Sequence, residues 1–433
     1  MTTDLSLPAS FVESLVGRFA AAAPPRPLRA RPVHVVYGGA HLFKEGTVAK
    51  LGDLARRAMK TWAGDAPTFG RIVGVTDAAL TQQVMARVLE KLDRRPVEAM
   101  CIDFEDGYGP RPDGEEDADA SRSAAELGRT SAPGTSIGIR IKALTTTTGR
   151  RALRTLDLFV TALANATGGA LPEGFSVTLP KVTCPEQVTA LADVLDELER
   201  SLAINTPIEM ELMIESPTAL LTPDGLGVPR LVEAGRGRVV AVHLGAYDLT
   251  SEVGVTAGDQ RLDHPYCDLA RMLLQLSTAG TTVGVSDGAT TTLPIAPKGA
   301  SPEESALAVH RAWELHACNI RRAIDVGIFQ GWDLHPAQLP ARYGALFAYF
   351  ISRKGAMTAR LRSFVEHATQ ASRVGQAFDD AATGQGLMTF FARGLACGAL
   401  DESDVRATGL GPEELSTSFA DIVAARSAGG SPE

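Results

Sequence analysis

Residues 208–216 read IEMELMIES, and residues 239–249 read VVAVHLGAYDL. Each stretch is a short apolar run that reaches a carboxylate near its end, Glu215 in the first and Asp248 in the second. Apolar runs of this length, bounded by turn residues, are typical of buried strands in a parallel sheet. The two stretches therefore predict strands whose ends carry acidic side chains.

Six further runs of the same kind are spread along the chain, separated by amphipathic stretches. The runs are VHVVYGG (33–39), AMCIDFED (99–106), SIGIRIKAL (136–144), FSVTLPKV (175–182), TVGVSDG (282–288) and GWDLHP (331–336). The stretches between them, such as PEQVTALADVLDELERSL (185–202), place apolar residues three and four apart, as helices packed on a sheet require. This alternation indicates an α/β protein, and eight strands favour a closed (β/α)8 TIM barrel. No Gly-x-Gly-x-x-Gly follows the first strand, which counts against an open dinucleotide-binding sheet.

The length of the chain predicts segments on either side of the barrel. A single barrel takes roughly 250 residues, whereas this chain has 433. We expect an N-terminal helical arm and linker over 1–31, the catalytic barrel over 32–353, and a C-terminal helical extension or lid over 354–433. The polar loop TTTLPIAPKGASPE (290–303) is a second candidate lid.

The composition excludes several classes of protein. A net charge of −9 argues against a nucleic-acid partner, because phosphate binding needs a concentrated cationic face. The five cysteines are scattered, without a Cys-x-x-Cys pair, which is typical of free thiols in a reducing compartment. No apolar run is long enough to span a bilayer, and the N-terminus lacks the basic region of a signal peptide. We therefore expect a cytoplasmic protein without a membrane partner.

Glu215 and Asp248 are the candidate metal ligands. The ends of all barrel strands meet on one face, where barrel enzymes have their active sites. Mg²⁺ and Mn²⁺ prefer oxygen ligands, take few of them from the protein and leave positions for water and substrate. Two carboxylates on neighbouring strands meet this need. The alternative is that either acid caps a helix or lies on the surface.

Arg140 is the candidate ligand for a substrate carboxylate. It lies between two isoleucines, so its side chain should point into the barrel mouth, where forked guanidinium donors match a carboxylate. The alternative is a structural ion pair with Glu105 or Asp106 on the neighbouring strand. Those two acids, close to Asp103, repel one another unless a cation lies near, which predicts an outer role around the metal. Asp106 could instead cap the next helix.

Two further residues follow predicted strands. Lys181 could pair with the acids or with substrate, or form a Schiff base, and beside a metal we favour charge pairing. His335, in the stretch DLHPAQ, is either a substrate-binding residue or part of a structural turn.

The motifs are similar in kind and order to those of the citrate lyase β-subunit and HpcH/HpaI aldolase family. They are DFEDG (103–107), IRI (139–141), LPKV (179–182), MIESP (213–217), LGAYDL (244–249), HPYCDLARMLL (264–274) and DLHPAQ (333–338). The resemblance covers roughly residues 33–353, and malate synthase is a more distant relative. The segment after the first strand departs from the family, because YGGAHLFKEG carries His41 and Lys44 where members near their acyl-CoA site have an arginine.

The resemblance implies a barrel of the phosphoenolpyruvate/pyruvate type. Its metal ligands would be Glu215 and Asp248, its carboxylate arginine Arg140, and its outer acids Glu105 and Asp106. It further implies a Mg²⁺-dependent lyase or aldolase that forms or cleaves a carbon–carbon bond in a small 2-oxo or hydroxy acid, or in its CoA thioester, through a metal-stabilised enolate. A homo-oligomer, trimer or hexamer, is also implied. Two alternatives stay open: phosphoenolpyruvate-type phosphoryl or P–C chemistry, and a non-catalytic metabolite-binding protein.

Overall fold

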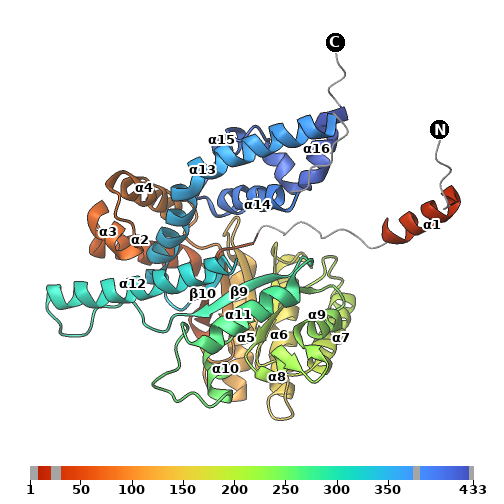
Figure 1. The fold of residues 1–433 in the computed structure, drawn as a ribbon. Coiled ribbons are helices and arrows are strands. Elements are labelled where there is room, and N and C mark those ends of the chain that lie inside the picture. Colours follow the sequence, from red (N-terminus) through yellow and green to blue (C-terminus); the bar gives the residue numbers. More distant parts are fainter. Residues whose placement is uncertain (1–7, 21–30, 374–380, 429–433) are drawn as a thin grey trace, which may run out of the picture.

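The computed structural model describes residues 8–20, 31–373 and 381–428, and a closed parallel barrel forms its centre (Figure 1). Within the described residues the barrel has eight strands, in the order β1-β10-β9-β8-β5-β4-β3-β2. The strands are β1 (His34–Gly39), β2 (Ala99–Asp103), β3 (Ser136–Arg140), β4 (Ser176–Leu179), β5 (Glu209–Ile214), β8 (Val239–Leu244), β9 (Gly284–Ala289) and β10 (Gln330–Asp333). The predicted (β/α)8 TIM barrel is confirmed.

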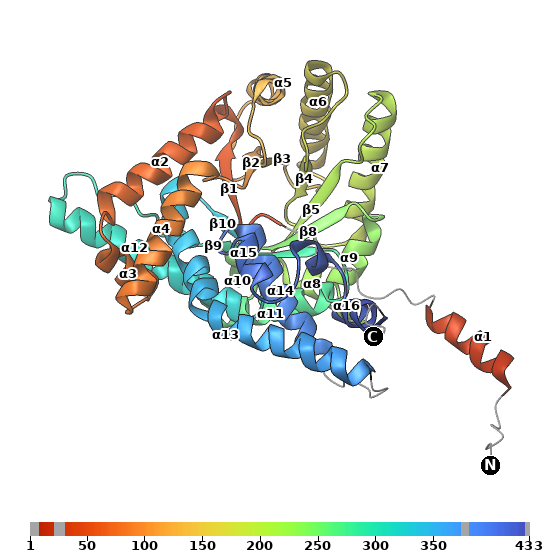
Figure 2. The ribbon, with the colours of Figure 1, turned by 90° about the horizontal axis from the view of Figure 1, so that it is seen from above.

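Helices surround the strands, as the view from above shows (Figure 2). Those before β5 are α2 (Thr47–Trp62), α3 (Ala66–Val73), α4 (Ala78–Arg94), α5 (Asp113–Arg129), α6 (Gly149–Thr167) and α7 (Pro185–Ser201). Those between β5 and β10 are α8 (Pro217–Leu220), α9 (Val228–Ala234), α10 (Ala246–Glu252), α11 (Pro265–Thr278) and α12 (Pro302–Asp325). A short antiparallel pair, β6 (Leu221–Thr222) and β7 (Gly225–Leu226), follows α8.

Several strands end earlier than the sequence patterns predict. The second ends at Asp103 rather than at residue 106, and the third ends at Arg140 rather than at residue 144. The run 239–249 divides into β8 and the first turns of α10. Polar residues predicted at strand ends, such as Glu105, Asp106 and Glu215, therefore lie in the loops at the carboxyl ends of the strands. Such loops can turn side chains toward one another in ways that strand alternation does not allow.

The C-terminal helices lie at the amino ends of the strands. Helix α13 (Leu339–Arg373) runs unbroken through the predicted boundary at 353/354, and α14 (Ala381–Cys397), α15 (Glu402–Arg406) and α16 (Phe419–Ala428) pack along it. Arg393 Nη1 donates to the carbonyl of Gly327, in the turn before β10, at 2.9 Å. Figure 1 shows these helices at the end of the barrel opposite α8 and α10. Helix α13, about 50 Å long at 1.5 Å per residue, extends past the barrel on the side away from the carboxyl ends of the strands. The C-terminal segment is thus helical in its described part, and its role as a lid stays a prediction.

The N-terminal arm contains a helix, α1 (Ala9–Ala20), which stands apart from the barrel in Figure 1. The predicted linker lies largely outside the described residues. In the part of the chain that the structure describes, no helix has both the length and the apolar character needed to cross a membrane.

Candidate active site at the carboxyl end of the barrel

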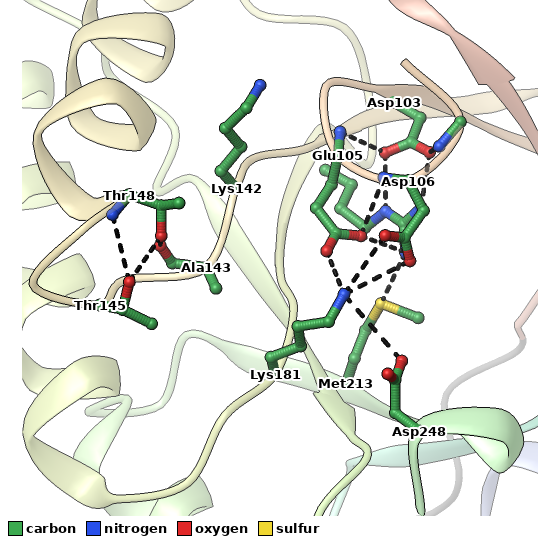
Figure 3. Close-up of polar contacts among 12 residues, drawn as sticks. Asp103, Glu105, Asp106, Lys142, Ala143, Thr145, Thr148, Lys181, Met213 and Asp248 are labelled. Atoms are coloured by element: carbon green, nitrogen blue, oxygen red, sulfur yellow. Dashed lines mark hydrogen bonds and ion pairs between the residues drawn. The ribbon is translucent and has the colours of Figure 1, made fainter. Parts of the chain in front are cut away.

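Asp103 organises the loop that follows β2. Its carboxylate accepts hydrogen bonds from the backbone N–H groups of Glu105 (2.9 Å) and Gly107 (2.7 Å), so the DFEDG stretch folds back around this side chain. A Cβ at residue 107 would lie 2.6 Å from Asp103 Oδ2, which explains the glycine there. The loop consequently presents Glu105 and Asp106 to the barrel mouth (Figure 3).

Arg140 is buried at the end of β3, beside Asp103 in the strand register. Its Nε and Nη2 donate to the two oxygens of Asp103 at 2.7 and 2.5 Å. The guanidinium lies over the rings of Tyr37 and Trp332, 5.0 and 5.2 Å from their centroids. Burial alone lowers the pKa of Arg140, but the hydrogen bonds and charge of Asp103 outweigh this and raise it above its usual value. The arginine is therefore always charged.

Arg140 binds Asp103, a partner that the sequence did not predict, and it also makes the predicted ion pair with Glu105 and Asp106. Two of the three guanidinium nitrogens, Nε and Nη2, bind Asp103. The remaining nitrogen, Nη1, lies 3.1 Å from Glu105 Oε2 and 3.8 Å from Asp106 Oδ2, and it donates to Met213 Sδ at 3.5 Å. Because Asp103 takes up Nε and Nη2, a ligand carboxylate could bind Arg140 only through Nη1.

Lys181 brings a second positive charge to the mouth. Its Nζ donates to Glu105 Oε1, lies 3.4 Å from both Asp106 oxygens and is 4.0 Å from Asp248 Oδ2 (Figure 3). Burial lowers the pKa of Lys181, but the contact with Glu105 outweighs it and the pKa rises above its usual value. The predicted charge pairing is present in the structure.

Glu215 follows β5 and is 4% exposed. Among the residues that the structure describes, its Oε2 has no hydrogen-bond partner. Burial raises the pKa of Glu215 to about 8; the nearby carboxylate of Asp248 adds to this effect, and the charge of Lys181 opposes it. Gly245 explains how the side chain fits, because a Cβ there would lie 2.2 Å from Glu215 Cγ.

Asp248 lies in the first turn of α10 and is half-exposed. The cap of this helix is Gly245, which makes no side-chain capping bond, and the cap after β5 is Ser216 rather than Glu215. Asp106 does not cap the next helix either, since α5 begins after Pro112. The capping alternatives for these three acids are therefore not what the structure shows.

The residues fit a divalent cation. The donor set is carboxylate oxygen, and one buried oxygen of Glu215 has no hydrogen-bond partner in the described part of the chain. Among the described residues, no three His, Cys, Asp or Glu side chains form a ready-made metal-binding group. Mg²⁺ does not need one, because it commonly takes one or two carboxylates and completes its shell with water and substrate. Glu215 and Asp248 would be its ligands here.

Three other polar residues near strand ends, Lys142, Asp287 and the candidate His335, have partners away from these carboxylates. Lys142 donates to Glu116 and to the carbonyl of Phe104. Asp287 binds the buried Arg271 through both oxygens. His335 Nδ1 accepts from the N–H of Ala337 at 3.1 Å and caps a short 3₁₀ turn, which matches the structural alternative for this residue. A substrate contact from His335 stays a prediction.

Comparison with known proteins places the chain in a family and confirms its fold. A family model described as a domain of unknown function, DUF6986, matches residues 14–422. The chain belongs to this family. No curated protein matches the sequence.

Solved structures share the barrel. A citrate lyase from Burkholderia xenovorans has a TM-score of 0.55 and 18% identity, with 90% of this chain and 98% of that chain covered. A Haloferax volcanii malate synthase has a TM-score of 0.47, 13% identity and coverages of 87% and 99%. CitE of Mycobacterium tuberculosis, in complex with magnesium and acetoacetate, has values of 0.42, 16%, 73% and 91%. The first of these structures confirms that the chain shares its fold with a citrate lyase barrel, and at 18% identity the likeness concerns the fold alone.

Proposed function

We propose that the protein is a Mg²⁺-dependent carbon–carbon lyase or aldolase that acts on a small 2-oxo or hydroxy acid, or on its CoA thioester. The observation that carries the proposal is the buried Glu215 oxygen that has no hydrogen-bond partner among the described residues, close enough to Asp248 and Glu105 for their charges to raise its pKa. Burying a carboxylate is costly, and a cation beside it offsets that cost. Mg²⁺, when bound, would supply the positive charge that stabilises an enolate.

The chain's own residues would hold the substrate. Arg140 Nη1, the nitrogen that Asp103 does not bind, would meet one oxygen of a substrate carboxylate beside Glu105, and Asp103 fixes the direction of that nitrogen. The rings of Tyr37 and Trp332 beneath the guanidinium keep water from its other face. Glu105 and Asp106 are the acids closest to this nitrogen, so they are positioned to accept or return a proton at the carbon beside the carbonyl.

The test begins with Mg²⁺ binding by isothermal titration calorimetry. We expect one site in the wild type and none in Asp248→Ala, with an unchanged circular dichroism spectrum. Asp224→Ala, at an exposed acid that pairs with Arg230, is the matched control and should bind Mg²⁺ normally. Mg²⁺ binding that persists in Asp248→Ala would remove the metal assignment.

Substrate class follows from a thermal-shift screen with and without Mg²⁺. Pyruvate, oxaloacetate, glyoxylate, malate, citramalate and acyl-CoAs are the ligands, and phosphoenolpyruvate is included to separate phosphoryl chemistry. A true ligand raises the melting temperature only with Mg²⁺, since stabilisation grows with the ratio of ligand concentration to Kd. Turnover of that ligand then distinguishes an enzyme from a metabolite-binding protein.

A further inference from the structure

Lys181 adopts a backbone conformation that its residue type disfavours. It follows β4 with a φ of +52°, in the left-handed region. The other described non-glycine residues with positive φ are Ala203 and Arg236, which lie in the turns that precede β5 and β8. At the carboxyl end of the barrel, within the described residues, Lys181 is thus the only side-chain-bearing residue held in this way. Strain that persists at a candidate site suggests that the side-chain direction it sets is used.

That direction carries the ammonium into the group of acids (Figure 3). Nζ contacts Glu105 and Asp106, lies 4.0 Å from Asp248 Oδ2 and interacts electrostatically with Glu215. The lysine therefore contacts or influences both candidate metal ligands and both outer acids. No other described lysine is paired with any of these four carboxylates.

The charges at the mouth show what the lysine balances. Arg140 is matched by Asp103, which binds it through both oxygens. Lys181 then pairs with Glu105, Asp106 and Asp248, and the remaining nitrogen of Arg140 lies beside the first two. A divalent ion bound by Glu215 and Asp248 would lie among the carboxylates that also attract the Lys181 ammonium. At such short range the ion and the ammonium would repel each other.

We propose that Lys181 is a positioning residue that acts as a built-in counter-ion: its ammonium competes with the divalent cation for this carboxylate field and thereby sets the affinity of the metal. The inference rests on the proposed function. Binding of the ion draws Asp248 away from Nζ and leaves the lysine held by Glu105 and Asp106. A lysine that only supported the loop would have no such competitive effect on metal affinity.

The experiment measures Mg²⁺ affinity by calorimetry in the full-length chain. In Lys181→Met the charge is lost and we expect Mg²⁺ to bind about tenfold more tightly, because removal of a nearby positive charge deepens the negative potential. Lys181→Arg keeps the charge and should keep the affinity within about threefold of wild type. Lys181→Gly removes the charge and also relieves the left-handed backbone, so it should bind as tightly as Lys181→Met even if the methionine variant folds poorly.

Melting temperature without metal gives a readout that does not depend on activity. Lys181→Gly should melt lower than wild type in EDTA, because Glu105, Asp106 and Asp248 lose their counter-ion, and saturating Mg²⁺ should remove most of that difference. Lys142→Met is the matched control, since this lysine pairs with Glu116 away from the cluster, and its Mg²⁺ affinity should equal that of wild type.

The outcomes separate this inference from the proposed function. Equal or weaker Mg²⁺ binding in both Lys181→Met and Lys181→Gly, beside normal binding in wild type, overturns the counter-ion role and leaves the metal site standing. Wild type that binds no Mg²⁺ refutes the proposed function. If the variants then bind the ion, the competition is nevertheless demonstrated; if they do not, the inference falls as well.

Discussion

Asp103 and Asp333 each lie at a strand end and bind a buried arginine through both carboxylate oxygens, but one pair lies in the barrel mouth and the other joins the barrel to its helices. Asp103, at the end of β2, binds Arg140 on the adjacent strand inside the mouth. Asp333, at the end of β10, binds Arg342 of α13 at 2.7 and 2.9 Å, between the barrel and its helices. The first arginine keeps one nitrogen near Glu105, toward the mouth.

The surroundings of Asp333 form a closed network. His34 Nδ1 and His316 Nε2 lie 3.3 and 3.0 Å from its oxygens, and all three side chains are almost completely buried. Trp332, the preceding residue, reaches Arg140 inside the barrel, so alternation turns Asp333 outward. The comparison teaches that an acid at a strand end belongs to the site only when it faces the mouth. An outward-facing pair joins strand to helix.

The largest expected effect is on stability, in Arg342→Met. This change leaves the Asp333 carboxylate buried without its main partner, which costs about 3–5 kcal/mol in the free energy of unfolding. Mg²⁺ affinity of the folded protein should be unchanged. Urea unfolding followed by circular dichroism measures the first quantity and calorimetry the second. The double variant Arg342→Met/Asp333→Leu should recover much of the loss, and a loss of Mg²⁺ binding in Arg342→Met would contradict the distinction between the two pairs.

Much of the fold follows from the sequence, because each predicted strand overlaps an observed one and hydrophobic periodicity depends on burial. The direction of the C-terminal helices does not, since a period gives the length of a helix and not the end of the barrel at which it packs. Of the site, the proximity of Lys181 to Glu105 and Asp106 could be predicted from strand ends alone. The hydrogen bonds between Arg140 and Asp103 could be predicted only from the register of β2 and β3, which places these two residues directly opposite each other. The left-handed conformation of Lys181 has no sequence signal, because neither lysine nor its neighbours favour it.

A smaller effect concerns pH and contrasts Glu215 with Asp333. Burial raises the pKa of Glu215 to about 8, above its value in the unfolded chain, so the stability linked to its proton is present at low pH and lost as pH rises through about 8. Burial alone would also raise the pKa of Asp333, but Arg342 and the histidines hold it well below its usual value. Metal-free wild type and Asp333→Asn should each lose on the order of 2 kcal/mol between about pH 6 and pH 9, whereas Glu215→Gln should lose little of this. Urea unfolding in EDTA at the two pH values measures the losses, and identical losses in wild type and Glu215→Gln would refute the buried, protonated state of Glu215.

The smallest expected effect uses two glycines, one beside each region. An alanine at residue 245 would bring its Cβ to 2.2 Å from Glu215 Cγ, close to the root of the side chain, so Glu215 must shift. An alanine at residue 331 would instead meet the guanidinium nitrogens of Arg342 at 2.7 Å. We expect Gly245→Ala to weaken Mg²⁺ binding about tenfold, a cost of about 1.4 kcal/mol, while Gly331→Ala keeps Mg²⁺ affinity and lowers the free energy of unfolding. For both variants, calorimetry measures the Mg²⁺ affinity and urea unfolding measures the free energy of unfolding, and each variant should change mainly one of the two. If Gly331→Ala also weakened Mg²⁺ binding, the two arginine–aspartate regions would be coupled and the outward pair could no longer be treated as structural alone.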